Sequence, residues 1–426
     1  MLKNHKEYDL IVIGAGAAGM LAAGYVAQRG YRVALLERNS ILGKKLLITG
    51  KGRCNLTNAG DEEEFINAFG KQGSFLYSAI YSFTSNDTIS FFKNLGLETK
   101  VERGNRVFPV TDKSHDVVDK LELHLKKSGA DIFLEHRVKK VKKKDGVDSQ
   151  YTVETTKGKI LKSKTILLTT GGASYPKTGT TGDGYKLAED LGHRVVPISP
   201  ALVPLELAED WAKELQGLSL RNVQLSIVGP KGKAIDSQFG EMIFTHFGIS
   251  GPIVLTLSNQ VQVCLKKGPV PLHINLKPAL TLEQLDNRIL RDFEEFANKQ
   301  FKNSLSQLLP QKLIPVIIRL SQVDPEKKVN QITKSERDRL IQSLTELKCT
   351  VVKTRPLEEA IVTAGGVDLK EIDPRTMESK VREGIYFAGE VMNIDGVTGG
   401  YNLQAAFSTG YLAAKGIEEK LEEVTT

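Results

Sequence analysis

Residues 8–37 read YDLIVIGAGAAGMLAAGYVAQRGYRVALLE, and this stretch decides the fold. A short apolar run, Tyr8–Ile13, is followed by a glycine-rich turn, an alanine-rich segment that ends at Gly30, and a second apolar run, Arg32–Leu36. Strand, tight turn, helix and strand in this order form the unit from which parallel sheets are built. The sequence therefore predicts an α/β fold class.

The turn contains Gly14-Ala15-Gly16-Ala17-Ala18-Gly19, which matches the G-x-G-x-x-G motif between a strand and a helix. The first glycine allows the tight turn, the second lets a pyrophosphate approach the backbone, and the third lets helix and strand pack closely. Glu37 follows Gly19 by 18 residues, where a carboxylate accepts hydrogen bonds from ribose hydroxyls and repels a 2′-phosphate. These residues predict a site for the ADP half of FAD or NAD, and NADP is disfavoured.

Length and composition limit the class of protein. The 426 residues predict two or three domains, and 40% hydrophobic with 26% charged residues is typical of a soluble, cytoplasmic protein without a membrane partner. Three cysteines without a C-x-x-C pair support neither a disulfide framework nor a metal site. The net charge of +7 is compatible with an anionic partner such as a nucleotide or RNA. A run of lysines over 139–144 before Asp145-Gly146 predicts a solvated hairpin tip in preference to a nucleic-acid patch.

The pattern changes along the chain indicate a Rossmann-like domain that is interrupted by an insertion. Residues from 195 are rich in Val, Ile, Leu and Pro, and no glycine occurs between Pro269 and Ala364. Three helical stretches are predicted within the insertion, at Leu282–Phe301, Leu305–Leu320 and Lys334–Leu347. We therefore expect a discontinuous nucleotide-binding domain over 1–194 and 348–426, an inserted β-barrel-like domain over 195–280, and a small helical domain over 281–347.

The C-terminal part of the sequence favours FAD over NAD. Gly389-Glu390 follows a predicted strand, and Gly400-Tyr401-Asn402 opens the last predicted helix, 402–422. The positive end of that helix suits the N1–C2=O edge of an isoalloxazine, and NAD has no equivalent group. A second strand–GxGxxG–helix unit does not occur after Gly19, so either external NAD(P)H reaches the flavin through an open site or another donor reduces it.

Several long motifs resemble one family of bacterial flavoproteins. They are KKLLITGKGRCNLTN at 44–58, GGASYPKTG at 171–179, TGDG at 181–184, FTHFGISGP at 244–252 and the segment 389–404. The sequence resembles the NAD(FAD)-utilising dehydrogenases, also described as aminoacetone-oxidase-family FAD-binding enzymes. The resemblance implies a two-dinucleotide-binding-domain fold related to the fumarate-reductase group, with an inserted barrel and a small helical domain. It also implies that the loop after the second strand passes the flavin, and that the backbone at Val138 meets the adenine edge.

The motifs and the resemblance together give an expected set of contacts to FAD. The set comprises Gly14, Gly16, Ala17, Ala18, Gly19, Glu37, Arg38, Lys45, Thr49, Gly50, Gly52, Arg53, Cys54, Asn55, Val138, Thr170, Gly171, Gly172, Gly389, Glu390, Gly400, Tyr401, Asn402 and Leu403. For Cys54, packing or contact with the flavin is favoured over redox catalysis, because no partner thiol is near it in sequence.

Three residues are candidates for the chemistry beside the flavin. His246, next to Thr245 in a glycine-bounded loop, suits a proton donor or oxyanion partner, and a histidine satisfied by local hydrogen bonds is the alternative. Arg53 suits a clamp for an anionic group or for negative charge on reduced flavin.

The expected function is that of a FAD-dependent oxidoreductase. It would transfer hydride between flavin N5 and an unsaturated or amine-type small molecule. The resemblance also implies an alternative, the reduction of uracil in ribosomal RNA, and a non-catalytic flavin-binding scaffold is the third hypothesis. Substrate identity, electron donor and oligomeric state are left open by these residues.

Overall fold

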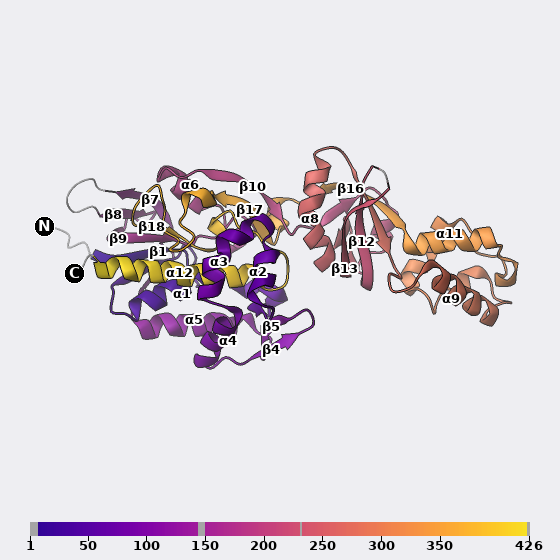
Figure 1. The fold of residues 1–426 in the computed structure, drawn as a ribbon, viewed down its shortest axis with the longest axis horizontal. Helices are drawn as coiled ribbons and strands as arrows, with labels where there is room; N and C mark the ends of the chain where they lie inside the picture. Colours follow the sequence, from indigo (N-terminus) through magenta and orange to yellow (C-terminus); the bar gives the residue numbers. More distant parts are fainter. Residues whose placement is uncertain (1–6, 144–149, 231, 424–426) are drawn as a thin grey trace. The chain divides into compact units, whose positions relative to one another are not determined.

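The computed structural model describes residues 7–143, 150–230 and 232–423, and the chain forms two compact units (Figure 1). The first, which we call the sheet unit, comprises Met1–Ala201 and Ala360–Thr426. The second, which we call the barrel unit, comprises Leu202–Glu359. Among the described residues, no helix is long and apolar enough to cross a membrane.

A seven-stranded sheet forms the centre of the sheet unit. The strand order is β6 (Asp131–Phe133), β2 (Val33–Leu36), β1 (Glu7–Ile13), β9 (Ile160–Leu168), β8 (Tyr151–Thr155) and β7 (Val138–Lys143), and β18 (Ile385–Phe387) also pairs with β9. β1 runs parallel to β2 and β9, and β18 runs parallel to β9. The predicted α/β Rossmann-like fold is confirmed. The carboxyl ends of these parallel strands meet at one edge, where ligands bind in such sheets.

Two helices that are far apart in sequence, α1 and α12, pack against each other on this sheet (Figure 1). α1 spans Ala17–Ala27 and α12 spans Tyr401–Glu423, within one residue of the predicted final helix. A Cβ at Gly410 would lie 2.7 Å from the Ala18 carbonyl oxygen, so the glycine allows the close approach. Alanines on α1 contribute to the same buried core.

Shorter elements complete the sheet unit. Its remaining helices are α2 (Glu62–Ala68), α3 (Gly73–Ser82), α4 (Ser85–Asn94), α5 (Ser114–Ser128) and α6 (Asp183–Asp190). A small sheet has the order β3 (Thr57–Asn58), β5 (Arg106–Pro109) and β4 (Thr99–Glu102), and β10 (Val195–Ala201) pairs with β17 (Val362–Val367). Residues 131–143 form two strands, β6 and β7. The chain bends between them because Glu135 and His136 donate backbone hydrogen bonds to Asn39 and Glu37.

The barrel unit is a closed six-stranded barrel with a helical insertion. The strand order is β11 (Leu205–Leu207), β14 (Gly248–Ser250), β13 (Ala234–Phe244), β12 (Ser219–Val228), β15 (Val270–Asn275) and β16 (Leu347–Thr354). The unit also contains α7 (Trp211–Glu214) and α8 (Pro252–Leu265). Between β15 and β16 lie α9 (Leu282–Glu295), α10 (Ile314–Ser321) and α11 (Lys334–Thr345). One continuous apolar core joins the barrel and these helices.

The structure places several boundaries differently from the sequence analysis. β10 pairs with β17 and so belongs to the sheet unit, whereas β16 closes the barrel and so extends the barrel unit to Glu359. The helix predicted over 305–320 is confined to Ile314–Ser321, because Pro310 and Pro315 limit where a helix can begin. β7 and β8 pair antiparallel, as the predicted hairpin requires, and its tip at 144–149 lies outside the described residues.

Candidate cofactor site

The glycines of the first turn have different surroundings. A Cβ at Gly14, where φ is +107°, would lie 2.6 Å from the Thr169 carbonyl oxygen, and a Cβ at Gly19 would lie 2.5 Å from Thr169 Oγ1. A Cβ at Gly16 would meet no atom within 4 Å. Gly16 is the N-cap of α1, whose first turn has no acidic residue and no side-chain cap. The open space therefore faces the positive end of a helix that has no side-chain cap, which suits a pyrophosphate.

Glu37 is a buried carboxylate that is held by N–H donors. It follows β2 and is 7% exposed. Its Oε2 accepts from the Ala15 N–H at 2.9 Å, and its Oε1 accepts from the Asn39 N–H and Nδ2, both at 2.8 Å. An ionised carboxylate has about four acceptor sites. One site remains for a further donor, such as a ribose hydroxyl.

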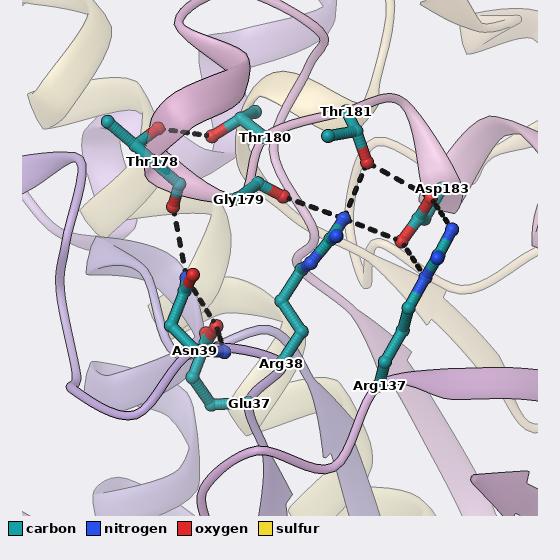
Figure 2. Close-up of polar contacts among 9 residues, drawn as sticks. All are labelled: Glu37, Arg38, Asn39, Arg137, Thr178, Gly179, Thr180, Thr181 and Asp183. Carbon is teal, nitrogen blue, oxygen red and sulfur yellow. Dashed lines mark hydrogen bonds and ion pairs between the residues drawn. The ribbon is translucent and has the colours of Figure 1, made fainter. Parts of the chain in front are cut away.

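The segment 178–183 is hydrogen-bonded to the residues that follow β2 (Figure 2). Asn39 Nδ2 donates to the Thr178 carbonyl at 3.0 Å, and Arg38 Nη1 donates to the Gly179 carbonyl at 3.2 Å. Asp183 accepts from Arg38 at 2.9 Å and from Arg137 Nε at 2.7 Å, and Figure 2 shows it between the two guanidinium groups. The charge of Arg38 is therefore directed to Asp183, and its expected contact with the cofactor stays a prediction.

The predicted adenine edge lies next to Glu37. The His136 N–H donates to the Glu37 carbonyl at 2.8 Å, and the Glu135 N–H donates to the Asn39 carbonyl at 2.9 Å. Val138, which begins β7, is buried and follows this segment directly. The structure thus brings together the glycine turn, Glu37 and the segment before Val138, which are far apart in sequence.

A second polar cluster joins four distant segments of the sheet unit. Lys45 Nζ donates to Glu390 Oε2 at 2.7 Å and to Ser174 Oγ at 2.8 Å. Glu390 Oε1 accepts from the Thr363 N–H at 2.9 Å, and Thr363 Oγ1 accepts from the Ser174 N–H at 3.1 Å. Lys45 and Glu390 belong to the FAD contacts expected from the sequence, whereas Ser174 and Thr363 do not. Ser174 lies inside a quoted motif, but no sequence pattern singles out Thr363.

The glycine pair after β9 belongs to the same cluster. A Cβ at Gly172 would lie 2.5 Å from Thr363 Oγ1, so only glycine fits there without movement. Gly171 has φ of +71°, in the left-handed region that favours glycine. Both residues belong to the expected FAD contacts. The close approach at Gly172 and the positive φ at Gly171 explain why glycine occupies this strand end.

The loop after β2 is backbone-strained and holds Cys54 inside the protein. Lys51 and Cys54 each have φ of +59°, and Cys54 has no exposed surface. Burial raises the pKa of the Cys54 thiol to about 12, so the thiolate is not populated near neutral pH. This agrees with the packing role favoured for Cys54. Strained residues of this kind cluster at ligand sites.

Two buried acceptors near these loops lack partners. In the described part of the chain, Asn55 Oδ1 and Thr170 Oγ1 are buried side-chain atoms without a hydrogen bond. Each unsatisfied group costs about 1–3 kcal/mol unless a ligand or water completes it. Both positions were predicted as cofactor contacts. With the open space at Gly16, they make the site chemically suited to FAD.

Arg53 contacts protein carboxylates. Its Nε donates to Asp112 Oδ1 at 2.8 Å, its Nη2 pairs with Glu102, and its guanidinium lies 4.1 Å from the centroid of the Phe108 ring. The hydrogen bonds to Glu102 and Asp112 raise the pKa of Arg53 above its ordinary value. The predicted anion clamp is therefore compensated by two acidic residues of the protein.

The start of α12 is also fixed by the protein. Asn402 Oδ1 accepts from the Gly396 N–H at 2.8 Å, and its Nδ2 donates back to the Gly396 carbonyl at 2.9 Å. Buried Gln404 Oε1 accepts from Thr57 Oγ1 at 2.7 Å and from Thr88 Oγ1 at 2.8 Å. Sequence reasoning did not select Gln404, although it lies in a quoted motif. The Asn402 side chain therefore shapes the loop, which leaves backbone N–H groups for a ligand.

His246 lies in the barrel unit on an exposed loop. The Thr245 N–H donates to the Gly248 carbonyl at 2.8 Å, and Thr245 Oγ1 accepts from the Gly248 N–H at 3.2 Å. The His246 ring is exposed and meets the Phe247 ring edge-to-face, with centroids 4.9 Å apart. An exposed imidazole on a tightly closed loop can exchange a proton with a ligand.

Comparison with known proteins places the chain among flavoproteins. Residues 8–416 match the HI0933-like protein Rossmann domain. The chain is 30% identical over 412 residues to the 3-dehydro-bile acid delta(4,6)-reductase of Clostridium scindens, covering 96% of this chain and 98% of that protein. It is 33% identical over 411 residues to the ribosomal RNA dihydrouridine synthase of Escherichia coli strain K12, with the same coverage of 96% and 98%.

A solved structure supports the fold assignment. The open conformation of a flavocytochrome c3 fumarate reductase superposes with a TM-score of 0.51 and 16% identity, covering 98% of this chain and 79% of that one. At this identity the likeness concerns the fold alone. The predicted relation to the fumarate-reductase group is confirmed at that level.

Proposed function

This chain belongs to the HI0933-like family and is a FAD-binding flavoprotein of the oxidoreductase class, and we propose that it reduces a carbon–carbon double bond conjugated to a carbonyl group. The observation that carries the proposal is the chemistry shared by two relatives that align from end to end. A 3-dehydro-delta(4,6) bile acid has double bonds conjugated to its 3-oxo group. Dihydrouridine is uridine whose ring double bond, conjugated to a ring carbonyl, is saturated.

The sheet unit supplies the groups that would hold FAD. The open space at Gly16 and the start of α1 would receive the pyrophosphate, and Glu37 would receive the adenosine ribose. Asn55 Oδ1 and Thr170 Oγ1, which lack partners among the described residues, would accept hydrogen bonds from the flavin half. When bound and reduced by an external donor, FAD would supply a hydride to one carbon of the double bond.

The protein must supply the proton for the other carbon. We assign this role to His246, because its ring is exposed and its loop is closed by two hydrogen bonds. Thr245 shapes that loop through its hydroxyl, so it acts as a positioning residue. Proton and hydride together replace one carbon–carbon π bond with two C–H bonds. The reductant, external NAD(P)H or another donor, stays a prediction.

Two substrate classes share this chemistry. The bile acid reductase supports a small unsaturated carbonyl compound, which is our first candidate. The identity to the ribosomal RNA enzyme and the net charge of +7 support uracil in RNA as the second. The narrower resemblance to aminoacetone-oxidase-family enzymes and the turnover on amines stay predictions.

A product assay separates these hypotheses. The holoenzyme, reduced anaerobically, is incubated with a 3-oxo-Δ4,6 steroid acid or with unmodified ribosomal RNA, the oxidised holoenzyme is incubated with aminoacetone, and products are analysed by mass spectrometry. We expect a gain of two hydrogens at the conjugated double bond, and RNA reduction should fall steeply with added salt. His246→Ala should slow product formation while FAD stays bound. If no substrate of either conjugated class is reduced, the proposal fails and the scaffold hypothesis gains support.

A further inference from the structure

The loop that carries His246 is fixed to a neighbouring strand of the barrel unit. The Phe247 carbonyl accepts from the Leu207 N–H of β11 at 3.1 Å, in addition to the two hydrogen bonds that close the loop. β11 and β14 pair antiparallel next to this contact, through Leu205 with Ile249 and Glu206 with Gly248. The backbone of the loop is thus set by β11.

Arg355 fixes the side-chain face of the same loop. Its guanidinium lies 4.6 Å from the centroid of the Phe247 ring, a distance typical of a cation–π contact. Its Nη1 donates to Glu206 Oε1 at 2.7 Å, and its Nε donates to Glu359 Oε2 at 3.0 Å. The planar fork of arginine suits these simultaneous contacts in a way that a lysine ammonium does not.

The two carboxylates come from the two ends of the barrel unit. Glu206 lies in β11, soon after the chain enters the unit at Leu202, and Glu359 is its last residue. The Arg355 N–H also donates to the Pro204 carbonyl at 2.9 Å. Arg355 therefore joins the entering segment, the leaving segment and the His246 loop.

Glu359 also interacts electrostatically with His246. The hydrogen bond from Arg355 is the main reason that the pKa of the Glu359 carboxyl lies below its usual value, and the charge of His246 also lowers it. The imidazole thus contacts the Phe247 ring and interacts electrostatically with the Glu359 carboxylate. Glu206 is further balanced by Lys353 at 3.2 Å.

We propose that Arg355 is a positioning residue for His246. It orders Phe247 and Glu359, and through them it sets where the imidazole lies during proton transfer. The inference rests on the proposed function, since it gives the loop a role only if His246 delivers the proton. Nothing in it depends on which conjugated substrate is reduced.

The test compares Arg355→Ala and Arg355→Lys with a matched control, Arg319→Ala. Arg319 also belongs to the barrel unit and forms an ion pair, with Glu214 at 2.9 Å. Three quantities are measured on holoenzyme: hydrogen exchange of the peptide over 243–250, the turnover number, and the recovery of turnover with added guanidinium ion. FAD content is measured for every variant.

For Arg355→Ala we expect faster exchange over 245–248 and a fall in turnover on the order of 10²-fold, because small displacements of a reacting group have effects of that size. Guanidinium should restore part of the turnover and slow the exchange. Arg355→Lys should stay impaired, since it keeps the charge without the fork. FAD content should be unchanged, and Arg319→Ala should match the wild type.

Different outcomes overturn different statements. Unchanged exchange in Arg355→Ala, or faster exchange with full turnover, overturns the positioning role. Full turnover in His246→Ala overturns the proton donor of the proposed function, and it does so independently of the exchange data. If Arg355→Ala does not fold, Glu359→Gln is the second variant, with faster loop exchange expected and unchanged exchange contradicting the proposal.

Discussion

Substitutions at Gly16 and Gly19 should separate an effect on cofactor binding from an effect on folding, although both glycines belong to one motif. A Cβ at Gly16 meets no atom within 4 Å, and φ there is −85°, which any residue adopts. Gly16→Ala should therefore change the free energy of unfolding of the apoprotein by no more than about 0.5 kcal/mol. A Cβ at Gly19 would lie 2.5 Å from Thr169 Oγ1, where 3.4–4 Å is ordinary contact. Gly19→Ala should destabilise the apoprotein by about 1–3 kcal/mol.

Gly16→Ala, which should leave the stability of the apoprotein nearly unchanged, should nevertheless weaken FAD binding. The methyl group of Gly16→Ala occupies the space that we assign to the pyrophosphate, and losing one hydrogen bond to that charged group costs about 1.5–3 kcal/mol. The Kd for FAD should rise by about 10- to 10²-fold. Urea unfolding of the apoprotein and a fluorescence titration with FAD measure the two quantities. Wild-type FAD affinity in folded Gly16→Ala would refute the assignment of this space.

Four further predictions concern the sheet unit. Gly24→Ala should destabilise the fold by about 1–3 kcal/mol in urea unfolding, because its Cβ would overlap the His124 ring, and a neutral effect would show that the ring can move. Burial lowers the pKa of His124 below the ordinary 6.5, so the unfolded chain binds the proton more readily. The stability from the neutral ring is complete above pH 6.5, declines below it and is lost as pH falls through the lower folded-state pKa. His124→Phe should reduce this slope of stability against pH, and an unchanged slope would contradict the prediction. Asp183→Asn should speed FAD release several-fold in stopped-flow displacement, since the segment 178–183 loses its ion pairs, and an unchanged rate would count against a role in retention. Native Cys54 should resist thiol reagents at about pH 8, because the buried group stays protonated, whereas rapid labelling of the folded holoenzyme would mean that it is accessible.

The first nucleotide-binding elements could be predicted because their signals are local. The apolar runs around the glycine turn specify a parallel βαβ unit, and the periodicity of residues 402–422 specifies a helix. Gly14, Gly16 and Gly19 have separate steric reasons that the motif encodes. Glu37 could be predicted from its spacing alone, and the structure places it against the glycine turn through Ala15.

Other features depend on pairing between distant segments, which local patterns do not record. β16 closes the barrel by pairing with β15 and β11 across the helical insertion, so the end of the barrel unit could not be read from composition. Thr363 reaches Glu390 only because β17 lies beside that strand end. The sequence does not show that Glu102 and Asp112, which are distant from Arg53 in the chain, pair with its guanidinium. Each of these depends on which partner the fold brings to a side chain.

A single turnover without oxygen measures the reductase activity most directly. Holoenzyme whose FAD has been reduced chemically is mixed with a conjugated 3-oxo steroid or with unmodified ribosomal RNA, while flavin absorbance and product are followed together. We predict that the absorbance of oxidised flavin returns in step with one equivalent of saturated product for at least one of the two substrates. Flavin that stays reduced with both, or that reoxidises without saturated product, would contradict the function proposed for this chain.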